Sequence, residues 1–160
     1  IKILAKVAML LNEKYLLPVK FYFSLNAIEW RNHSQNFGNY GITVGALSVF
    51  QCPRFYKKMD AVVFPSILEC FSATPLEALA MRKPLFASDR GFVRDVCGEH
   101  AYYFDPLNSE EIASVIAGYF NGRQKTDSEL DLAHEHVIAF SNSQQRAKEY
   151  LEIIKQYLKR

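Results

Sequence analysis

AVVFPSILECFSATPLEALA is the sequence of residues 61–80. It begins with an apolar run at residues 61–64, which is typical of a buried β-strand. A loop of small and polar residues follows, and an apolar helical pattern then continues to about Met81. A strand that leads through a short loop into a helix is the repeating unit of parallel α/β sheets. We therefore expect this loop at the carboxyl end of a strand, the edge at which open α/β sheets bind ligands.

Two carboxylates lie in this stretch with seven residues between them. Glu69 follows the strand, and Glu77 lies just inside the helical pattern. Each offers oxygen acceptors to ligand hydroxyls. Two local roles remain open as alternatives. Glu69 fits a solvated loop, and Glu77 fits a capping box with Thr74 as N-cap and Pro75 as the first helical residue.

The start of this helix also offers backbone donors. Unpaired N–H groups and the positive end of the helix dipole favour phosphate and other anions. This signal is common to α/β folds, so it points to a ligand only in combination with the two glutamates. The amides concerned are those of Phe71, Ser72, Ala73 and Thr74.

Helical and strand patterns alternate through the first 122 residues. The expected strands are continuous apolar runs, which is typical of a parallel sheet covered on both faces. Because parallel crossovers are nearly always right-handed, we predict an α/β fold, a Rossmann-like three-layer sandwich with a parallel sheet. Helices are expected at 1–17, 27–38, 51–59, 75–81, 93–97 and 109–120, and strands at 19–23, 42–44, 61–64, 84–87 and 101–104.

The same patterns predict the domain organisation. Residues 1–122 are expected to form one Rossmann-like domain. Only helical patterns follow, at 127–139 and 143–159, and we expect residues 123–160 to pack as helices on the same domain. A parallel sheet of this kind usually opens with a strand, whereas this chain opens with a helical pattern. We therefore expect that an N-terminal strand is missing and that the chain is a fragment of a longer protein.

Composition narrows the function classes. Apolar residues make up 49% and charged residues 22% of the 160 residues, which is typical of a globular domain. The net charge of +2 gives no case for nucleic-acid binding. The three cysteines are widely spaced without a Cys-x-x-Cys pair, which favours reduced thiols and a cytoplasmic location. The four histidines form no metal-binding pattern, and no apolar run reaches the roughly 18 residues of a membrane span.

The combined pattern resembles the Glu-x7-Glu signature of retaining, nucleotide-sugar-dependent glycosyltransferases of the GT-B fold, group 1. The resemblance covers about residues 59–120, and more loosely residues 1–58 through Gly45. It implies the C-terminal, donor-binding half of such an enzyme. The residues that carry it are Asp60-Ala61-Val62-Val63-Phe64-Pro65-Ser66, Glu69, Phe71, Pro75-Leu76-Glu77-Ala78, Lys83-Pro84 and Asp105-Pro106.

The resemblance also implies roles for individual residues. Glu69 is expected to be catalytic, contacting hydroxyls of the transferred sugar near the reacting carbon. Glu77 is expected to hold the ribose of the nucleotide. The amides after Glu69 would face the sugar and diphosphate, and the loop after the strand at 42–44 would border the base. The remaining expected donor-binding residues are Phe71, Ser72, Ala73, Thr74, Ser66, Gly45 and Ala46.

The implied reaction transfers a sugar from a nucleoside-diphosphate sugar to a hydroxyl acceptor, with retained configuration, in surface polysaccharide or glycoconjugate synthesis. No metal or other cofactor is expected, because positive side chains and the helix dipole stabilise the leaving diphosphate in this family. The implied partner is a missing N-terminal acceptor-binding domain, which carries any peripheral contact with the inner face of the membrane. The isolated chain is expected to be inactive.

The chain departs from the family pattern at Cys70, Ser72 and Arg82, where glycine is usual or frequent. Cys70 and Ser72 restrict the backbone beside the expected diphosphate site. One alternative is therefore a non-catalytic Rossmann-like binding domain that has lost its donor site. A receiver-like module is a further alternative, but it requires an acidic pair near the end of the first strand that the sequence does not show.

Overall fold

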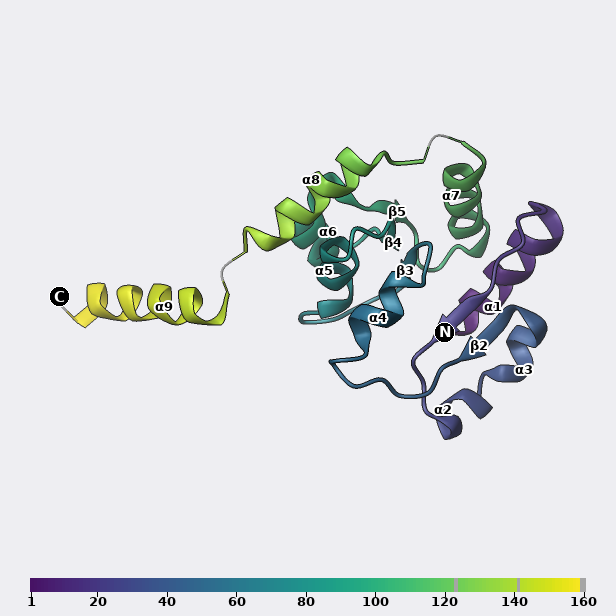
Figure 1. Cartoon of the computed structure of the whole chain (residues 1–160), viewed down its shortest axis with the longest axis horizontal. Helices are drawn as coiled ribbons and strands as arrows, with labels where there is room; N and C mark the ends of the chain where they lie inside the picture. The colour runs from purple at the N-terminus through teal and green to yellow at the C-terminus, as the bar shows by residue number, and fades with distance from the viewer. Residues whose placement is uncertain (123, 141, 159–160) are drawn as a thin grey trace.

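The computed structural model describes residues 1–122, 124–140 and 142–158 (Figure 1). The helices are α1 (Lys2–Met9), continued by the π-helical turn η1 (Leu10–Lys14), α2 (Ala27–Arg31), α3 (Ser34–Phe37), α4 (Cys52–Lys57), α5 (Ala73–Ala80), α6 (Gly91–Cys97), α7 (Ser109–Asn121), α8 (Asp127–Ile138) and α9 (Ser143–Leu158). Two 3-10 turns are η2 (Gly38–Tyr40) and η3 (Gly98–His100). The strands are β1 (Phe21–Phe23), β2 (Gly41–Thr43), β3 (Val62–Phe64), β4 (Leu85–Ser88) and β5 (Tyr102–Phe104).

The strands form two parallel sheets. β1 pairs with β2, and β3, β4 and β5 form a three-stranded sheet with β4 in the centre. Parallel neighbours need a crossover, and α5 and α6 provide it on either side of β4. Each expected strand lies within one or two residues of its predicted bounds. The α/β fold with parallel sheets is therefore confirmed.

Helices cover both faces of the three-stranded sheet. On one face, Phe86 and Phe104 pack against α1 and α7. On the other face, Leu85 and Ala87 pack against α5, α6 and α8. Because successive strand residues face opposite sides, β4 needs an unbroken apolar run to fill both layers. This arrangement is the expected three-layer sandwich.

α1 lies across both sheets. The buried residues of α1 and of its continuation η1 recur at helical spacing, and Val7, Ala8 and Leu11 have no exposed surface. Val7 and Leu11 belong to the cluster beneath α7, whereas Ala8 belongs to a cluster with Phe37 of α3. The Asn12 side chain then closes the helix by donating to Ala8 O (2.8 Å) and Val19 O (3.0 Å). These bonds fix the connection that leads from α1 into β1.

The two C-terminal helices differ in their packing. In α8, Ala133 and Val137 are buried against α5 and α6. His134 Nδ1 lies 2.7 Å from Ala80 O, and His136 Nε2 lies 2.9 Å from Val96 O. Residues 143–158 of α9 are all exposed, and Figure 1 shows this helix extending away from the domain. The expectation that residues 123–160 pack on the domain therefore describes α8 but not α9.

The end of α5 explains one departure from the family pattern. Arg82 follows the helix with φ +53°, in the left-handed region that glycine adopts without steric cost. Its guanidinium donates a hydrogen bond to the carboxylate of Asp131 on α8. Arg82 therefore accepts a conformation that favours glycine and links α5 to α8.

Replacement of Phe86 by alanine tests the centre of the core. Phe86 is fully buried, and its ring packs on Tyr102, Tyr119 and Phe120. Phe86→Ala is expected to lower the free energy of unfolding by about 3–5 kcal/mol in urea titrations. Phe50→Ala is the matched control, because Phe50 is 95% exposed and its loss should leave stability unchanged. An equal effect of both variants would contradict this account of the core.

Candidate functional site

The loop between β3 and α5 lies at the carboxyl edge of the three-stranded sheet. Ser88, at the end of β4, is fully buried. Its Oγ lies 3.0 Å from Phe64 O and 2.5 Å from Ser66 O. These contacts tie the start of the loop to the neighbouring strand, so the expected site residue Ser66 is held through its backbone. Sequence reasoning missed Ser88, although a polar residue that ends an apolar strand run is a usable signal.

α5 begins earlier than the sequence suggested. Ser72 is the N-cap, with φ −128° and ψ 134°, and Ala73 is the first helical residue. Pro75 then occupies the third helical position, where its missing N–H still costs no helical bond. The capping box considered for Thr74 and Glu77 is therefore wrong, because Thr74 is not the N-cap.

Glu77 instead accepts a hydrogen bond from a distant residue. The Tyr56 hydroxyl on α4 donates to Glu77 Oε2 at 2.9 Å. Tyr56 is only 9% exposed, whereas Glu77 is exposed. Burial raises the pKa of the Tyr56 phenol, and the bond to Glu77 raises it further. The phenol thus remains a donor at neutral pH and holds one carboxylate oxygen, while the carboxylate still faces solvent.

Tyr56 was not identified from the sequence. The helical pattern at 51–59 predicted its element, but nothing local points from this residue to Glu77, which lies 21 positions away. The available signal was a tyrosine, an aromatic residue with a hydroxyl group, on the short helix that precedes β3. Such residues usually find a hydrogen-bond partner when buried.

Glu69 lies in the loop and is partly exposed. Within the described residues, its carboxylate makes no hydrogen bond or ion pair. It stands three residues before the N-cap of α5, and Glu77 lies in the second turn of that helix. Both carboxylates therefore reach solvent from the same loop–helix unit, and neither is buried.

The loop residues after Glu69 border a small cavity. Cys70, Phe71 and Ser72 line it together with Pro75, and α6 contributes Phe92, Asp95 and Val96. Its volume of about 200 Å³ is below the roughly 300–1,000 Å³ of typical ligand pockets. A larger ligand would therefore lie along the open edge, against the amides of Ala73 and Thr74 in the first turn of α5, which have no partner inside the helix.

The replacement of glycine at Cys70 and Ser72 does not strain this loop. Among the described non-glycine residues, a positive φ occurs at Leu16 and Arg82. Ser72 is extended, a conformation open to any residue. The loop therefore forms without glycine at these two positions.

Gly45 and Ala46 lie in a different loop, after β2. Gly45 has φ +81° and its N–H donates to Thr43 Oγ1 at 3.1 Å. The positive φ gives a physical reason for glycine at this position. None of the described hydrogen bonds connects Gly45 or Ala46 with the loop between β3 and α5. The structure thus places the expected donor-binding residues in two separate loops.

The arginines that follow β4 are already paired. Arg94 makes two bonds to Asp89, at 2.5 and 3.0 Å, and its guanidinium lies over the Tyr103 ring. The hydrogen bond from Arg94 lowers the pKa of Asp89. Arg90 lies 3.4 Å from Asp105. In this structure both arginines therefore contact neighbouring carboxylates.

Other site types find no support in the described part of the chain. No group of three or more His, Cys, Asp or Glu side chains there is arranged to hold a metal ion. The three cysteines are free, with Cys70 exposed, Cys52 partly exposed and Cys97 buried. No helix among the described residues has the length and apolar character needed to cross a membrane.

Comparison with known families identifies the chain. The family described as glycosyl transferases group 1 matches residues 32–131, more than half of the 160 residues. The chain belongs to this family. The match includes the loop between β3 and α5, together with Tyr56, Glu69 and Glu77. A search of curated proteins gave no match.

Solved structures share the fold of this group 1 domain. A glycosyltransferase from Rickettsia africae has a TM-score of 0.77 at 21% identity, over 98% of this chain and 44% of its own. A sucrose-phosphate synthase from Thermosynechococcus elongatus has a TM-score of 0.72 at 18% identity, over 95% of this chain and 42% of its own. Staphylococcus aureus TarM, solved with UDP, has a TM-score of 0.71 at 19% identity, over 94% of this chain and 31% of its own. The chain therefore spans less than half of each protein, with the Rossmann-like fold of GT-B glycosyltransferases.

A double-mutant cycle tests the link between α4 and α5 in this group 1 domain. Tyr56→Phe keeps the buried ring but removes the donor to Glu77, so we expect a loss of about 1 kcal/mol in the free energy of unfolding. In a Glu77→Ala background, the same change should cost much less, because the acceptor is already gone. Tyr22→Phe is the control and should have no effect. Additive losses in the cycle would rule out the bond.

Proposed function

We propose that the chain is the donor-binding domain of a retaining glycosyltransferase that uses a nucleoside-diphosphate sugar. Residues 1–122 form the nucleotide-sugar-binding unit, and transfer goes to a hydroxyl acceptor bound by a separate domain of the whole protein. The observation that carries the proposal is the exposed Glu77 carboxylate, oriented by Tyr56 beside the first turn of α5, in a member of the group 1 family.

Glu77 suits a ribose diol. An ionised carboxylate accepts several hydrogen bonds, and adjacent hydroxyls present two donors to its oxygens. The bond from Tyr56 fixes the orientation of the carboxylate before the ligand arrives, so less rotamer freedom is lost on binding. Glu77 thereby positions the nucleotide along the edge of α5.

The start of α5 suits the diphosphate. The amides of Ala73 and Thr74 and the positive end of the helix dipole favour an anion at this end. Phe71 and Ser72 lead into the helix and complete the surface that faces the phosphates. Because the arginines after β4 are paired, further positive charge for the leaving diphosphate is assigned to the rest of the protein.

Glu69 suits the transferred sugar. It has no partner among the described residues and lies on the loop that leads to the diphosphate end of α5. Hydrogen bonds from sugar hydroxyls to this carboxylate position the ring while positive charge develops on it and the leaving group departs. Interactions of this kind speed the reaction when they strengthen in the transition state. We assign no protein nucleophile.

UDP is the first nucleotide to test, because S. aureus TarM, which shares the fold, was solved with UDP. Gly45 and Ala46 are assigned to the border of the base. We assign the whole enzyme to surface polysaccharide or glycoconjugate synthesis in the cytoplasm, with any contact to the inner face of the membrane made by the acceptor-binding domain. No metal is assigned to the donor site, so chelators should leave the activity unchanged.

Calorimetry with UDP and GDP on the full-length protein tests donor binding. Glu77→Ala should weaken nucleotide binding at least about 10-fold, the equivalent of 1.4 kcal/mol, because two ribose contacts are lost. Glu135→Ala is the control, since Glu135 is an exposed carboxylate on α8. The affinity of this variant for the nucleotide should be unchanged. No binding of either nucleotide by the unmodified protein would favour the alternative, a non-catalytic domain that has lost its donor site.

Steady-state kinetics of donor turnover separates the roles of the two glutamates. In the full-length enzyme, Glu69→Gln should lower kcat by about 100-fold or more with little change in donor KM, because the contact matters most in the transition state. Glu77→Gln should mainly raise the donor KM. The assignment fails if Glu69→Gln retains its kcat, or if both variants change only KM.

A further inference from the structure

The small cavity beside the start of α5 has both apolar and polar walls. Phe71 of the loop and Phe92 of α6 border it from two different elements. Pro75 and Val96 add further apolar surface, and Asp95 of α6 adds a carboxylate. The three residues that α6 contributes have no part in the donor site proposed above.

Asp95 is free to accept a hydrogen bond. Its side chain is exposed, and no hydrogen bond or ion pair reaches its carboxylate from the part of the chain that the structure describes. Asp89 and Asp105, by contrast, each lie against an arginine. A carboxylate accepts hydrogen bonds from a ligand and repels a second negative charge. Asp95 therefore favours a ligand group that carries a donor and no negative charge.

Ser72 offers the complementary donor. A serine at the N-cap usually accepts a bond from the backbone of the first helical turn. The Ser72 side chain makes no such bond, although Ser72 is the N-cap of α5. It lines the cavity instead. Its hydroxyl is therefore available to donate to an acceptor on the same ligand group.

The aromatic walls favour an apolar end on that group. Phe71 is 64% exposed, and Phe92 is partly exposed. The Phe92 ring packs edge-on against Phe64 of β3, with 6.5 Å between the ring centroids, which fixes one wall of the cavity. Because apolar surface gains free energy when it leaves water, a methyl or similar group binds well between such walls.

The volume of the cavity narrows the choice of group. About 200 Å³ is the space of about six water molecules, which excludes a nucleotide and exceeds what a hydroxyl group fills. A methyl group alone has no donor for Asp95, and a carboxylate or phosphate would be repelled by it. An acetamido group has an N–H donor, a carbonyl acceptor and a methyl end, so it matches all three kinds of wall.

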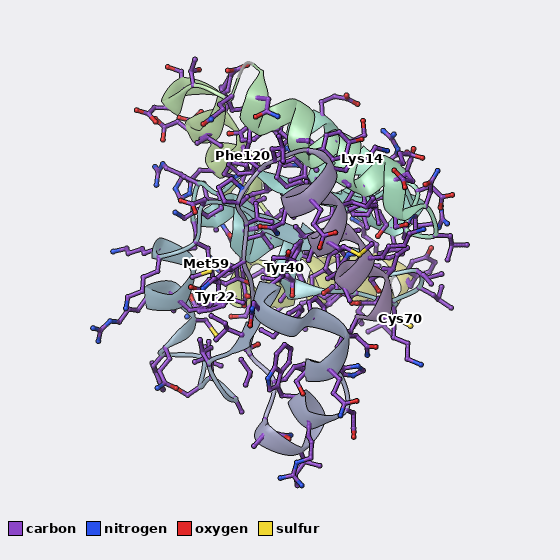
Figure 2. The ribbon with its side chains drawn as sticks, turned by 90° about the vertical axis from the view of Figure 1, so that its right-hand side faces the viewer. Lys14, Tyr22, Tyr40, Met59, Cys70 and Phe120 are labelled. Carbon is purple, nitrogen blue, oxygen red and sulfur yellow. The ribbon has the colours of Figure 1, made fainter. Side chains whose placement is uncertain are left out.

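The cavity lies next to the residue that is proposed to hold the sugar. Cys70, Phe71 and Ser72 line the cavity and follow Glu69 directly in the chain. Cys70, labelled in Figure 2, is exposed. Consecutive Cα atoms are about 3.8 Å apart, so Glu69 and the cavity belong to one short stretch of loop. A sugar that is bound by Glu69 therefore reaches the cavity with a substituent of its ring.

We propose that this cavity receives the N-acetyl group of the transferred sugar, so that the donor is a nucleoside-diphosphate N-acetylhexosamine. Asp95 accepts the amide N–H, the Ser72 hydroxyl donates to the amide carbonyl, and the methyl group lies between Phe71 and Phe92. This inference rests on the proposed function, because it takes Glu69 as the group that holds the sugar. It adds the substrate class that the proposed function leaves open.

Calorimetry of the full-length protein with matched donors tests the proposal. The pairs are glucose with N-acetylglucosamine and galactose with N-acetylgalactosamine, each on whichever of UDP and GDP binds. In at least one pair, the acetamido sugar should bind about 10-fold or more tightly, because it gains a hydrogen bond to a carboxylate. Equal affinities within both pairs would overturn this inference and leave the proposed function standing. Failure of both nucleotides to bind would overturn the proposed function, and this inference with it.

Two substitutions connect the preference to the cavity. Asp95→Ala removes the acceptor and should reduce the preference for the acetamido sugar about 10-fold. Val96→Phe places a larger side chain in the cavity and should abolish or reverse the preference. Asp127→Ala is the control, since Asp127 is an exposed carboxylate on α8, and this variant should keep the preference of the unmodified protein.

Asp95→Ala keeps the test decisive even if Val96→Phe does not fold, because the Asp95 side chain is exposed. A preference for the acetamido sugar that survives Asp95→Ala undiminished would overturn the assignment of the cavity.

Discussion

The double burial of β4 is the constraint on which the rest of the structure depends. Leu85, Phe86, Ala87 and Ser88 have no exposed surface, so helices must cover both faces of the strand. That requirement places α5, α6 and α8 on one side and α1 and α7 on the other. It also places the loops at the carboxyl edge, where Ser88 ties the β3–α5 loop to the sheet. The site is therefore positioned by the core.

The sequence predicts the layers well because short apolar strands have few alternatives. An unbroken run such as residues 61–64 or 84–87 fits a strand with cover on both faces, and its partners follow from chain order. The first residue of α5 was harder to predict from the sequence. Proline is frequent at the first helical position, which favoured Thr74 as N-cap, but it is tolerated throughout the first turn. In the structure Ser72 is the N-cap, because its backbone is extended and Ala73 is the first residue with helical geometry.

Contacts between elements were beyond the sequence. The bond between Tyr56 and Glu77 joins two helices on either side of a strand, and no local pattern encodes it. The exposure of α9 is similar. Tyr150, Leu151, Ile154 and Leu158 form an apolar stripe that is typical of a packed helix, yet all four are exposed. The sequence pattern alone does not identify the surface against which such a stripe packs. The two candidate glutamates could be found from the sequence because they lie close together in it. The orientation of their side chains could not be predicted, because it depends on contacts that form only in the folded chain.

The uneven exposure of the three thiols has a practical consequence. Burial raises the pKa of Cys97 to about 11, and the Cys52 thiol donates to Ser48 O, whereas Cys70 is exposed on the loop that leads into α5 (Figure 2). Thiolate fraction and access govern alkylation, so a maleimide fluorophore reacts first at Cys70. The native chain thus carries its own attachment point for a dye at the edge of the sheet, and occupancy of that edge becomes readable as a change in fluorescence without an engineered residue.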